Sequence, residues 1–416
     1  MNRRYNVLTL DPMYSPLHAK IASILAKKKY AITSCVSKKI YLPRFKQYLA
    51  VDLIESVCKE QAKAYHAQLA KLNSYHHAYA RKFENRKLTE GELNYMARFY
   101  IALEDFIVSN NIELVILHNE TRWYHAVTIE ICKRHKIKYL VTEQGLIRPF
   151  TTIIDPRGTS ANSLITFDTG MIRKSPYKGS AFPRCKGKHD SLKSMLFFLM
   201  FLIGFTCERL YGNKTIVRYM HNGYSLKKYG KRLIRCFYKK KANYSEIKTR
   251  SILLLLQLER DSQVLLHSHF SSNQQVIDFV VEYAKVKGLD VAVKLHPLDN
   301  GKYQLPTNGY FVDGKVAALA EQSELVFTIN SSASIDVIKT TTPLILLGDS
   351  IYSQSGIAEQ LDFKIHEKPL IKIDPKVDLT LRKRFLEYLQ SDYLLSGAGY
   401  SFDNNAIKYK LKELLN

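Results

Sequence analysis

The stretch LVILHNETRWYHAVTIEICKRHKIKYLVTEQG, Leu114–Gly145, holds the pattern that decides the fold. Leu114–His118 and Lys138–Thr142 are short apolar runs typical of buried strands, and Trp123–His135 between them has helical periodicity. A strand, a helix and a second strand in one short segment predict a βαβ unit with parallel strands. The second strand leads into Glu143, so a carboxylate stands where a parallel sheet opens onto a ligand crevice.

The same alternation extends over the rest of the chain. In the first 170 residues we expect strands at Tyr5–Leu10 and Tyr30–Cys35, and helices at Leu17–Lys28, Val51–His77 and Leu88–Val108, the last with a Thr89–Glu92 capping box. Later strands are expected at Ile252–Gln257, Val291–His296, Leu325–Asn330 and Leu344–Leu347. Later helices are expected at Ser272–Lys287, Val316–Gln322, Ser332–Lys339, Leu379–Leu389 and Ala406–Leu415.

These two series predict an α/β protein with two Rossmann-like domains that face each other across a cleft. Residues 1–171 form the expected N-terminal domain, and 246–375 the expected C-terminal domain. Between them, 172–245 is interpreted as a basic, partly helical connector or insertion. Residues 376–416 are expected to form C-terminal helices.

Composition excludes several classes of protein. The 416 residues are 46% hydrophobic, which is ordinary for globular domains. Six cysteines without a CxxC pair argue against a zinc site or a disulfide framework, and the N-terminus shows no signal peptide. We therefore expect a reduced, cytoplasmic protein. The most apolar run, Met195–Phe205, is expected to be too short to span a bilayer.

The formal net charge of +24 indicates an anionic partner, unless it is only a solvated basic surface. Basic residues gather near Met195–Phe205, a mixture typical of an interfacial membrane surface, with a buried helix as the alternative. No helix-turn-helix, RRM or zinc signature points to nucleic acid. The basic residues are Lys186, Lys188, Lys193, Arg218, Lys227, Lys228, Lys231, Arg232, Arg235 and Lys239–Lys241.

Polar clusters follow five of the expected strands, where a doubly wound fold places its site. In the first domain, Glu143 and Glu120 are candidates for a general base or a nucleophile that attacks a sugar carbon. The alternative is that either carboxylate pairs with Arg122 or Arg148. The clusters are His118–His125, Glu143–Gly145 with Arg148, Gln257–Gln263 with His267-Ser268, Lys294–Pro297 and Asn330–Ser334.

In the second domain, Asn330–Ser334 opens an expected helix whose backbone N–H groups and hydroxyls could hold a phosphate, although Ser331 or Ser332 could instead be an N-cap. His296 could donate a hydrogen bond to a phosphate and protonate a leaving phosphate. Lys294 shares its strand face, either adding charge or remaining solvated. No DxD, GxGxxG or P-loop motif occurs, which disfavours a metal-bound diphosphate sugar, dinucleotides and ATP.

As a set, these clusters resemble the motifs of the capsule-polysaccharide β-Kdo transferases of Gram-negative bacteria, the KpsS/KpsC and LipB/LipA group. The N-terminal LDPMYSPLHAKIASIL is similar to the opening of that family. The other segments that carry the resemblance are NETRWYH, EQGLIRP, QLERDSQ with a following HS, KLHP, NSSAS, PLILLG and IYSQSGI, in this order between Asn119 and Ile357.

The resemblance implies a GT-B glycosyltransferase that takes CMP-Kdo, retains the β configuration and uses no metal or other cofactor. It implies Glu143 as the nucleophile, with Glu120 and His296 as further catalytic candidates, and Asn119, Arg122 and His125 on the acceptor side. The implied donor-binding residues are Arg148, Gln257, Asp261, Gln263, Ser268, Lys294, Pro297, Asn330, Ser331 and Ser332.

The implied partners are the nucleotide sugar, a glycolipid or Kdo-terminated acceptor, the anionic inner-membrane surface, and capsule assembly or export proteins. Gln144 departs from the family pattern, which has a second acid there, and Phe150 replaces the commoner aspartate. Gln144 leaves open a non-catalytic glycan- or lipid-binding scaffold. The HP and paired-serine motifs leave open another CMP-sugar transferase, such as a sialyltransferase.

Overall fold

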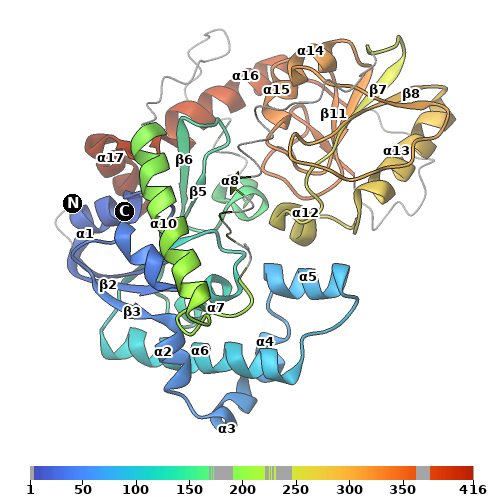
Figure 1. The fold of residues 1–416 in the computed structure, drawn as a ribbon. Coiled ribbons are helices and arrows are strands. Elements are labelled where there is room, and N and C mark those ends of the chain that lie inside the picture. Colours follow the sequence, from blue (N-terminus) through green and yellow to red (C-terminus); the bar gives the residue numbers. More distant parts are fainter. Residues whose placement is uncertain are drawn as a thin grey trace. The chain divides into compact units, whose positions relative to one another are not determined.

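The computed structural model describes residues 4–167, 170, 172, 191–220, 224, 226, 229–230, 246–361 and 375–415. The chain divides into two compact units, and Figure 1 shows the helices and strands of both. The first comprises Met1–Thr159, Cys185–Lys240 and Tyr393–Asn416, and the second Ser160–Arg184 and Lys241–Asp392. Each unit has helices packed on a mainly parallel sheet, so the expected α/β fold with two Rossmann-like domains is confirmed.

Elements of the first unit come from both ends of the chain. They are β1 (Tyr5–Leu10), α1 (Leu17–Leu25), β2 (Ala26–Thr33), η1 (Val36–Tyr41), β3 (Lys46–Leu49), α2 (Ala50–Glu55), α3 (Lys59–Ala62), η2 (Lys63–Tyr65), α4 (His66–Leu69), α5 (Tyr75–Phe83), α6 (Glu90–Ser109), β4 (Leu114–His118), α7 (Trp123–Arg134), β5 (Lys138–Gln144), β6 (Thr151–Asp155), α10 (Ser191–Leu210), β13 (Leu394–Ala398), β14 (Ser401–Phe402) and α17 (Asn404–Leu415).

Elements of the second unit lie mostly after residue 250. They are η3 (Ser160–Asn162), α8 (Leu164–Phe167), β7 (Ser251–Leu255), α12 (Ser262–His267), α13 (Asn273–Lys287), β8 (Asp290–Lys294), β9 (Gly309–Phe311), α14 (Val316–Glu321), β10 (Leu325–Thr328), α15 (Ser334–Ile338), β11 (Leu344–Leu346), β12 (Glu359–Gln360) and α16 (Leu379–Tyr388). A π-helical turn, η4 (Leu389–Tyr393), follows α16.

The first sheet has the order β14-β13-β6-β5-β4-β1-β2-β3. Its strands β3, β2, β1, β4 and β5 are parallel, and β6 and β13 then add antiparallel pairs. Successive residues of β1 enter different cores: Leu8 and Leu10 pack with residues of α6 and α7, whereas Val7 packs with residues of α1 and α17. Both faces are therefore covered, as expected for a doubly wound sheet.

The second sheet has the order β12-β11-β10-β7-β8-β9, and the strand pairs described are all parallel. Helix α13 packs on it through one apolar face that includes Val276, Ile277 and Val280. Ser272 caps this helix by accepting a hydrogen bond from the Gln275 N–H. The strand order reverses between β7 and β10, as it does between β1 and β4 in the first sheet.

Two expected helices of the first unit differ from the structure. The first ends at Leu25, because Ala26, Lys28 and Lys29 pair with β1 and start β2. The expected helix 51–77 is broken into α2, α3, α4 and the start of α5. Helices α2, α3 and α4 each contact α6, so the chain bends to follow that helix instead of running straight. The Thr89–Glu92 capping box at the start of α6 is present as expected.

Four strands of the first sheet, β3, β6, β13 and β14, were not expected. The residues of 376–416 divide between the units, since α16 lies in the second unit while β13, β14 and α17 lie in the first. Residues 160–167, expected in the N-terminal domain, group with the second unit. Most of the expected basic residues between 184 and 241 lie outside the described residues, apart from Lys193 and Arg218.

The apolar run Met195–Phe205 belongs to α10, a 20-residue helix. The expectation that this segment is too short to span a bilayer was wrong, because the helix continues beyond the run at both ends. Within the described residues, α10 is the one helix long and apolar enough to cross a membrane, by length and composition only. One face of α10 packs on η1, through Phe201, Leu202 and Phe205.

Candidate functional site

A polar site of the first unit lies where its strand order reverses. Asp11 directly follows β1, and His118 ends β4 before Asn119 and Glu120. Ligands of doubly wound sheets bind outside the carboxyl ends of the strands at this point. The topology therefore brings together residues that are more than 100 positions apart in the sequence.

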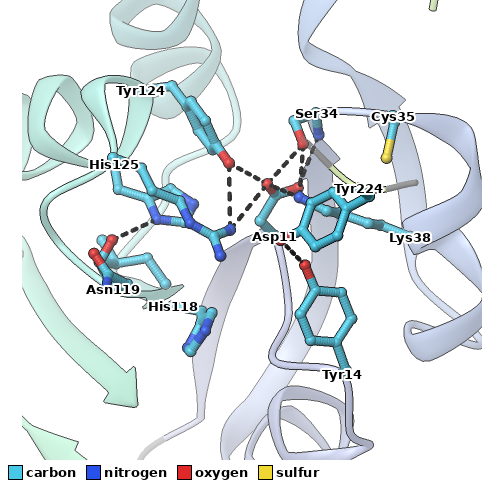
Figure 2. Close-up of polar contacts among 12 residues, drawn as sticks. Asp11, Tyr14, Ser34, Cys35, Lys38, His118, Asn119, Tyr124, His125 and Tyr224 are labelled. Atoms are coloured by element: carbon cyan, nitrogen blue, oxygen red, sulfur yellow. Dashed lines mark hydrogen bonds and ion pairs between the residues drawn. The ribbon is translucent and has the colours of Figure 1, made fainter. Parts of the chain in front are cut away.

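Asp11 is the centre of a buried cluster of polar side chains (Figure 2). Its carboxylate accepts hydrogen bonds from the N–H and hydroxyl of Ser34, at 2.8 and 2.7 Å. It also accepts from the ammonium of Lys38 and the hydroxyl of Tyr124. Nη1 of Arg122 lies 3.5 Å from the same carboxylate. The cluster thus ties the end of β1 to β2, η1 and α7.

The opposite charges in this cluster stabilise each other's ionised forms. Burial disfavours a charge on Asp11, but the cations of Lys38 and Arg122 outweigh it and hold the pKa of Asp11 below its usual range. Burial also disfavours a charge on Lys38, yet Asp11 raises the pKa of Lys38 above its ordinary value. The ion pair therefore remains charged at neutral pH.

Glu143, near the end of β5, is held on both of its oxygens. Asn119 Nδ2 donates to Oε2 at 2.8 Å, and the Gln144 N–H donates to Oε1 at 2.9 Å. Asn119 adopts a left-handed backbone conformation, with φ of 62°, and its Oδ1 accepts from the Thr121 N–H at 3.0 Å. The amide that positions Glu143 is thus itself fixed.

The Glu143 carboxylate is ionised and accessible. Burial alone would raise the pKa of Glu143, but His118, the Gln144 N–H, Asn119 and Arg122 together lower it. The side chain is 25% exposed, so a substrate can reach it. An ionised carboxylate with fixed orientation has the properties of a nucleophile or a general base.

Three buried histidines surround this carboxylate and Asp11. Burial lowers the pKa of His118 to about 4 and that of His18 to about 3, and it also lowers the pKa of His125 strongly, so all three rings are neutral at pH 7. His118 Nδ1 lies 2.8 Å from the Thr142 carbonyl, which can only accept, so the proton sits on Nδ1. His118 Nε2 is then unprotonated and lies 3.9 Å from Glu143 Oε1.

His125 has the same tautomer for the same reason. Its Nδ1 donates to the Asn119 carbonyl at 2.9 Å. Its Nε2 is buried and has no hydrogen-bond partner within the part of the chain that the structure describes. A buried acceptor left in this state costs about 1–3 kcal/mol, a cost that a bound hydroxyl would remove.

Other sequence-derived candidates of the first unit have different surroundings. Glu120 accepts from the N–H and hydroxyl of Thr159, at 2.8 and 3.0–3.2 Å, which fits a structural carboxylate. Nη1 of Arg122 lies 3.5 Å from the Asp11 carboxylate and 3.4 Å from the Tyr124 hydroxyl. Arg148 is exposed, and its Nε donates to the Gly145 carbonyl at 3.3 Å.

Gly145 fixes the turn that follows Glu143. Its N–H donates to the Thr151 carbonyl at 2.9 Å. A Cβ at this position would lie 2.1 Å from the Thr151 hydroxyl and 2.4 Å from the Thr151 carbonyl carbon. Only glycine allows β5 and β6 to approach so closely.

In the second unit, an amide pair joins the two strands at the reversal of strand order. Gln257, after β7, donates from Nε2 to Asn330 Oδ1 at 3.0 Å, and the Asn330 N–H donates to Gln257 Oε1 at 2.9 Å. Asn330 Nδ2 also donates to the carbonyls of Gln263 and Asp349. The side-chain amides of Gln257 and Asn330 therefore link the ends of β7 and β10 through hydrogen bonds.

The other donor-binding candidates of this unit lie in the loops and strand ends of the second sheet. Asp261 caps α12 through the Gln263 N–H, and Ser268 Oγ accepts from the Phe270 N–H. Lys294 is ion-paired with Asp313. His296 Nδ1 accepts from the Leu298 N–H at 3.1 Å, which places the proton of the neutral ring on Nε2. Pro297 is exposed beside it.

The serine segment does not open the expected helix. Helix α15 begins at Ser334, so Ser331 and Ser332 precede it, and the residue at the N-cap position is Ala333. The hydroxyl of Ser331 accepts from the Ala333 N–H at 3.2 Å. Buried Gln263 Oε1 and Ser334 Oγ have no hydrogen-bond partner in the described ranges, which marks them as groups that a ligand or water could satisfy.

Sequence reasoning did not single out Asp11, Lys38 or His18 as site residues, and it named His118 only as the first residue of a polar cluster. The position of Asp11, directly before a proline at the end of the first strand, was the available signal. Lys38 lay among unremarkable basic residues. Among the described residues, no group of three or more His, Cys, Asp or Glu could hold a metal ion.

Two Rossmann-like units, each with polar side chains at its reversal of strand order, place the protein in the α/β class that includes the GT-B glycosyltransferases. The family model for capsule polysaccharide biosynthesis proteins matches residues 113–400, more than half of the chain. The chain therefore belongs to this family, and the resemblance drawn from its motifs is confirmed.

Individual relatives are distant. The chain is 24% identical over 318 residues to the capsule polysaccharide export protein KpsS of Escherichia coli, covering 69% of this chain and 79% of KpsS. Its structure is similar to the β-Kdo 2,7 transferase KpsC of Thermosulfurimonas dismutans, with 12% identity, a TM-score of 0.39, and coverage of 76% of this chain and 90% of that one.

A further similar structure is the UDP-GlcNAc 2-epimerase of Methanocaldococcus jannaschii, with 13% identity, a TM-score of 0.24, and coverage of 92% and 98%. The two sheets and their strand order define the fold.

Proposed function

We propose that this protein is a retaining β-Kdo glycosyltransferase that uses CMP-Kdo in the synthesis of a capsule or surface polysaccharide. The observation that carries the proposal is Glu143, an ionised, accessible carboxylate held at both oxygens at the ligand-binding end of the first sheet. Membership in the capsule polysaccharide biosynthesis family supports the substrate class.

In this proposal Glu143 attacks the anomeric carbon of Kdo. A bond forms between a Glu143 oxygen and that carbon, while the bond from the carbon to the phosphate of CMP breaks and its electron pair leaves with CMP. An acceptor hydroxyl then displaces Glu143 from the same carbon. Two inversions at one carbon retain the configuration. His118 Nε2 is unprotonated and 3.9 Å from Glu143 Oε1, so it is placed to take the hydroxyl proton.

The second unit is proposed to hold the donor. Because Nδ1 of His296 already accepts a backbone hydrogen bond, Nε2–H is the group that can donate to the CMP phosphate. Further hydrogen-bonding groups are proposed from Ser331 and Ser332, which directly follow Asn330, and from Gln263, whose carbonyl accepts from Asn330 Nδ2 at 3.1 Å. Lys294 is paired with Asp313, so its contribution to phosphate binding is proposed to be small. We propose that no metal ion takes part.

The first unit is proposed to bind the acceptor, a glycolipid or a Kdo-terminated glycan. The motifs placed Asn119 on the side of the glycosyl acceptor; we propose that it positions Glu143 instead. The name of the E. coli relative supports a link to capsule export, and we propose the cytoplasmic face of the inner membrane as the location.

The test is a donor screen with purified protein and a synthetic Kdo acceptor. CMP-Kdo, generated in situ, or CMP-sialic acid is supplied, and added sugar is detected by mass spectrometry. We expect transfer of Kdo, a loss on the order of 10³-fold or more in Glu143→Gln, and a marked loss in His296→Ala. Glu120→Gln is expected to retain transfer when the protein is folded, because Glu120 is held by Thr159.

The outcomes separate the alternatives. Transfer from CMP-sialic acid alone would identify a different CMP-sugar transferase. No transfer from either donor, with several acceptors and with detergent present, would favour the non-catalytic scaffold. The Gln144 side chain is exposed, and only its backbone N–H contacts Glu143. The replacement of the second acid by Gln144 is therefore not in itself an argument for the scaffold.

A further inference from the structure

Helix α10, labelled in Figure 1, carries a stripe of exposed apolar side chains from Leu192 to Leu210. At 100° per residue, the exposed apolar side chains fall within roughly 140° of the helix circumference. Their exposed fractions range from 46% to 80%. The residues of this apolar stripe are Leu192, Met195, Leu196, Leu199, Met200, Ile203 and Leu210. No charged residue of α10 lies between them on the same arc.

The opposite face of α10 is fixed to the first unit. Phe201, Leu202 and Phe205 are buried in one cluster with Tyr41 and Tyr224. The acidic residue of the helix, Glu208, accepts from the N–H groups of residues 36 and 37 at 2.9 and 2.7 Å. A helix held in this way cannot leave the unit to cross a bilayer without breaking these contacts, although its length would allow it.

The charges on α10 and in the ten residues after it favour an anionic surface. From 191 to 220 the sequence holds four basic residues and one acidic residue. The basic residues Lys193, Arg209, Lys214 and Arg218 are exposed. The acidic residue is Glu208, whose carboxylate already accepts the two backbone N–H groups. Tyr211, 83% exposed directly after the helix, is a residue type enriched at the membrane–water interface.

We propose that α10 docks the protein on an anionic lipid bilayer, with the helix axis parallel to the membrane plane and the apolar stripe inserted at the headgroup boundary. Helices with one apolar face and basic flanks bind in this way, and their binding combines apolar burial with attraction to anionic lipid. Helix α10 would be the surface through which the protein reaches the membrane location proposed above, and in that respect the inference rests on the proposed function. It does not depend on the chemistry of Glu143.

A second copy of the chain is a poorer occupant of the stripe. Each copy carries a formal charge of +24 and the same basic residues beside α10. Pairing two stripes would bring these like charges together, whereas an anionic bilayer neutralises them.

Vesicle binding tests the proposal. The full chain is mixed with vesicles of phosphatidylglycerol and phosphatidylcholine, and with phosphatidylcholine alone, and bound protein is measured by flotation. We expect binding to the anionic vesicles that weakens with salt. The variant Leu196→Asp/Ile203→Asp should bind at least roughly tenfold more weakly. The matched control Val286→Asp/Leu298→Asp changes residues of similar exposure, 56% and 45%, in the second unit and should bind normally.

A second measurement reports the orientation of the helix. Leu199→Trp places an indole in the stripe, while the natural Trp123 is 1% exposed. Its fluorescence should shift to the blue with anionic vesicles and be quenched by lipids brominated at shallow depth, but not by lipids brominated near the bilayer centre.

Equal vesicle binding by wild type and Leu196→Asp/Ile203→Asp would overturn the proposal. So would a vesicle-free dimer that this variant converts to monomer, because that result assigns the stripe to a second copy. Transfer to a soluble acceptor separates the two hypotheses. The stripe variant should retain transfer, and Glu143→Gln should retain vesicle binding while losing transfer.

Discussion

Replacing Asp11 by asparagine is expected to destabilise the first unit strongly. Asp11 and Lys38 have no exposed side-chain surface, and Arg122 is only 7% exposed. The substitution preserves shape but leaves two buried cations without their carboxylate, and it turns a donor toward the Lys38 ammonium. Breaking a buried ion pair on one side costs about 3–5 kcal/mol. We expect a loss of this size in the free energy of unfolding.

The single tryptophan provides the assay. Trp123 is buried in α7, next in sequence to Arg122 and Tyr124, so its fluorescence in urea follows the unfolding of the first unit. Glu130→Gln, in the same helix, is the control: Glu130 forms an exposed pair with Lys133, and its loss should change stability by less than about 0.5 kcal/mol.

A double-mutant cycle tests the electrostatic explanation. Lys38→Met removes one cation and leaves Asp11 with Arg122 and Tyr124, so it should cost less than Asp11→Asn. Combining the two should restore at least about 1 kcal/mol relative to the sum of the single effects. If Asp11→Asn lowers stability by less than about 1 kcal/mol, the cluster is not held by charge, and the reasoning is refuted.

Three further predictions follow from the site. The folded-state pKa of His118, about 4, lies below its usual 6.5, so the stability that its neutral ring contributes is present above pH 6.5 and is lost as pH falls toward 4. That loss is about 2 kcal/mol at pH 5, and His118→Gln should reduce the pH slope measured by urea unfolding. Gly145→Ala should lower the melting temperature measured by circular dichroism, because the new Cβ would clash with Thr151 at 2.1 Å; an unchanged melting temperature would show that the turn can shift. Gln257→Leu removes both partners of the Asn330 amide pair and should destabilise the second unit by about 1–3 kcal/mol, measured by hydrogen exchange of that unit's strands; unaltered protection of β10 would contradict this.

The sequence predicted most of the fold, because buried parallel strands leave short apolar runs that are easy to recognise. Leu114–His118 and Tyr5–Leu10 have the expected bounds. The run Thr151–Asp155 is rich in β-branched residues, but it was not recognised as a strand because it follows an Arg-Pro step. Its partner β13 lies more than 230 residues away, and local pattern carries no information about such a pairing.

The candidate site was predicted less completely than the fold. Strand ends identified Glu143, His296 and Asn330, since every parallel strand ends at the same edge of its sheet. Sequence alone could not show which polar groups are occupied by the protein itself. Glu120 accepts hydrogen bonds from Thr159, and Lys294 forms an ion pair with Asp313. These contacts depend on residues whose proximity arises only in the folded chain.

The pair Glu143-Gln144 shows why the departure from the family pattern leaves the proposed catalytic carboxylate in place. Adjacent residues of a strand point to opposite sides, so two acids in this position could not both face the same ligand. The structure turns Glu143 toward Asn119 and His118, while the Gln144 side chain is exposed. Only the backbone N–H of Gln144 contacts the carboxylate, and any residue except proline supplies that donor. Restoring the acid by Gln144→Glu should therefore leave the transfer rate within about threefold of wild type, whereas Glu143→Gln should abolish it. A large gain in transfer from Gln144→Glu would show instead that the second acid is the catalytic one.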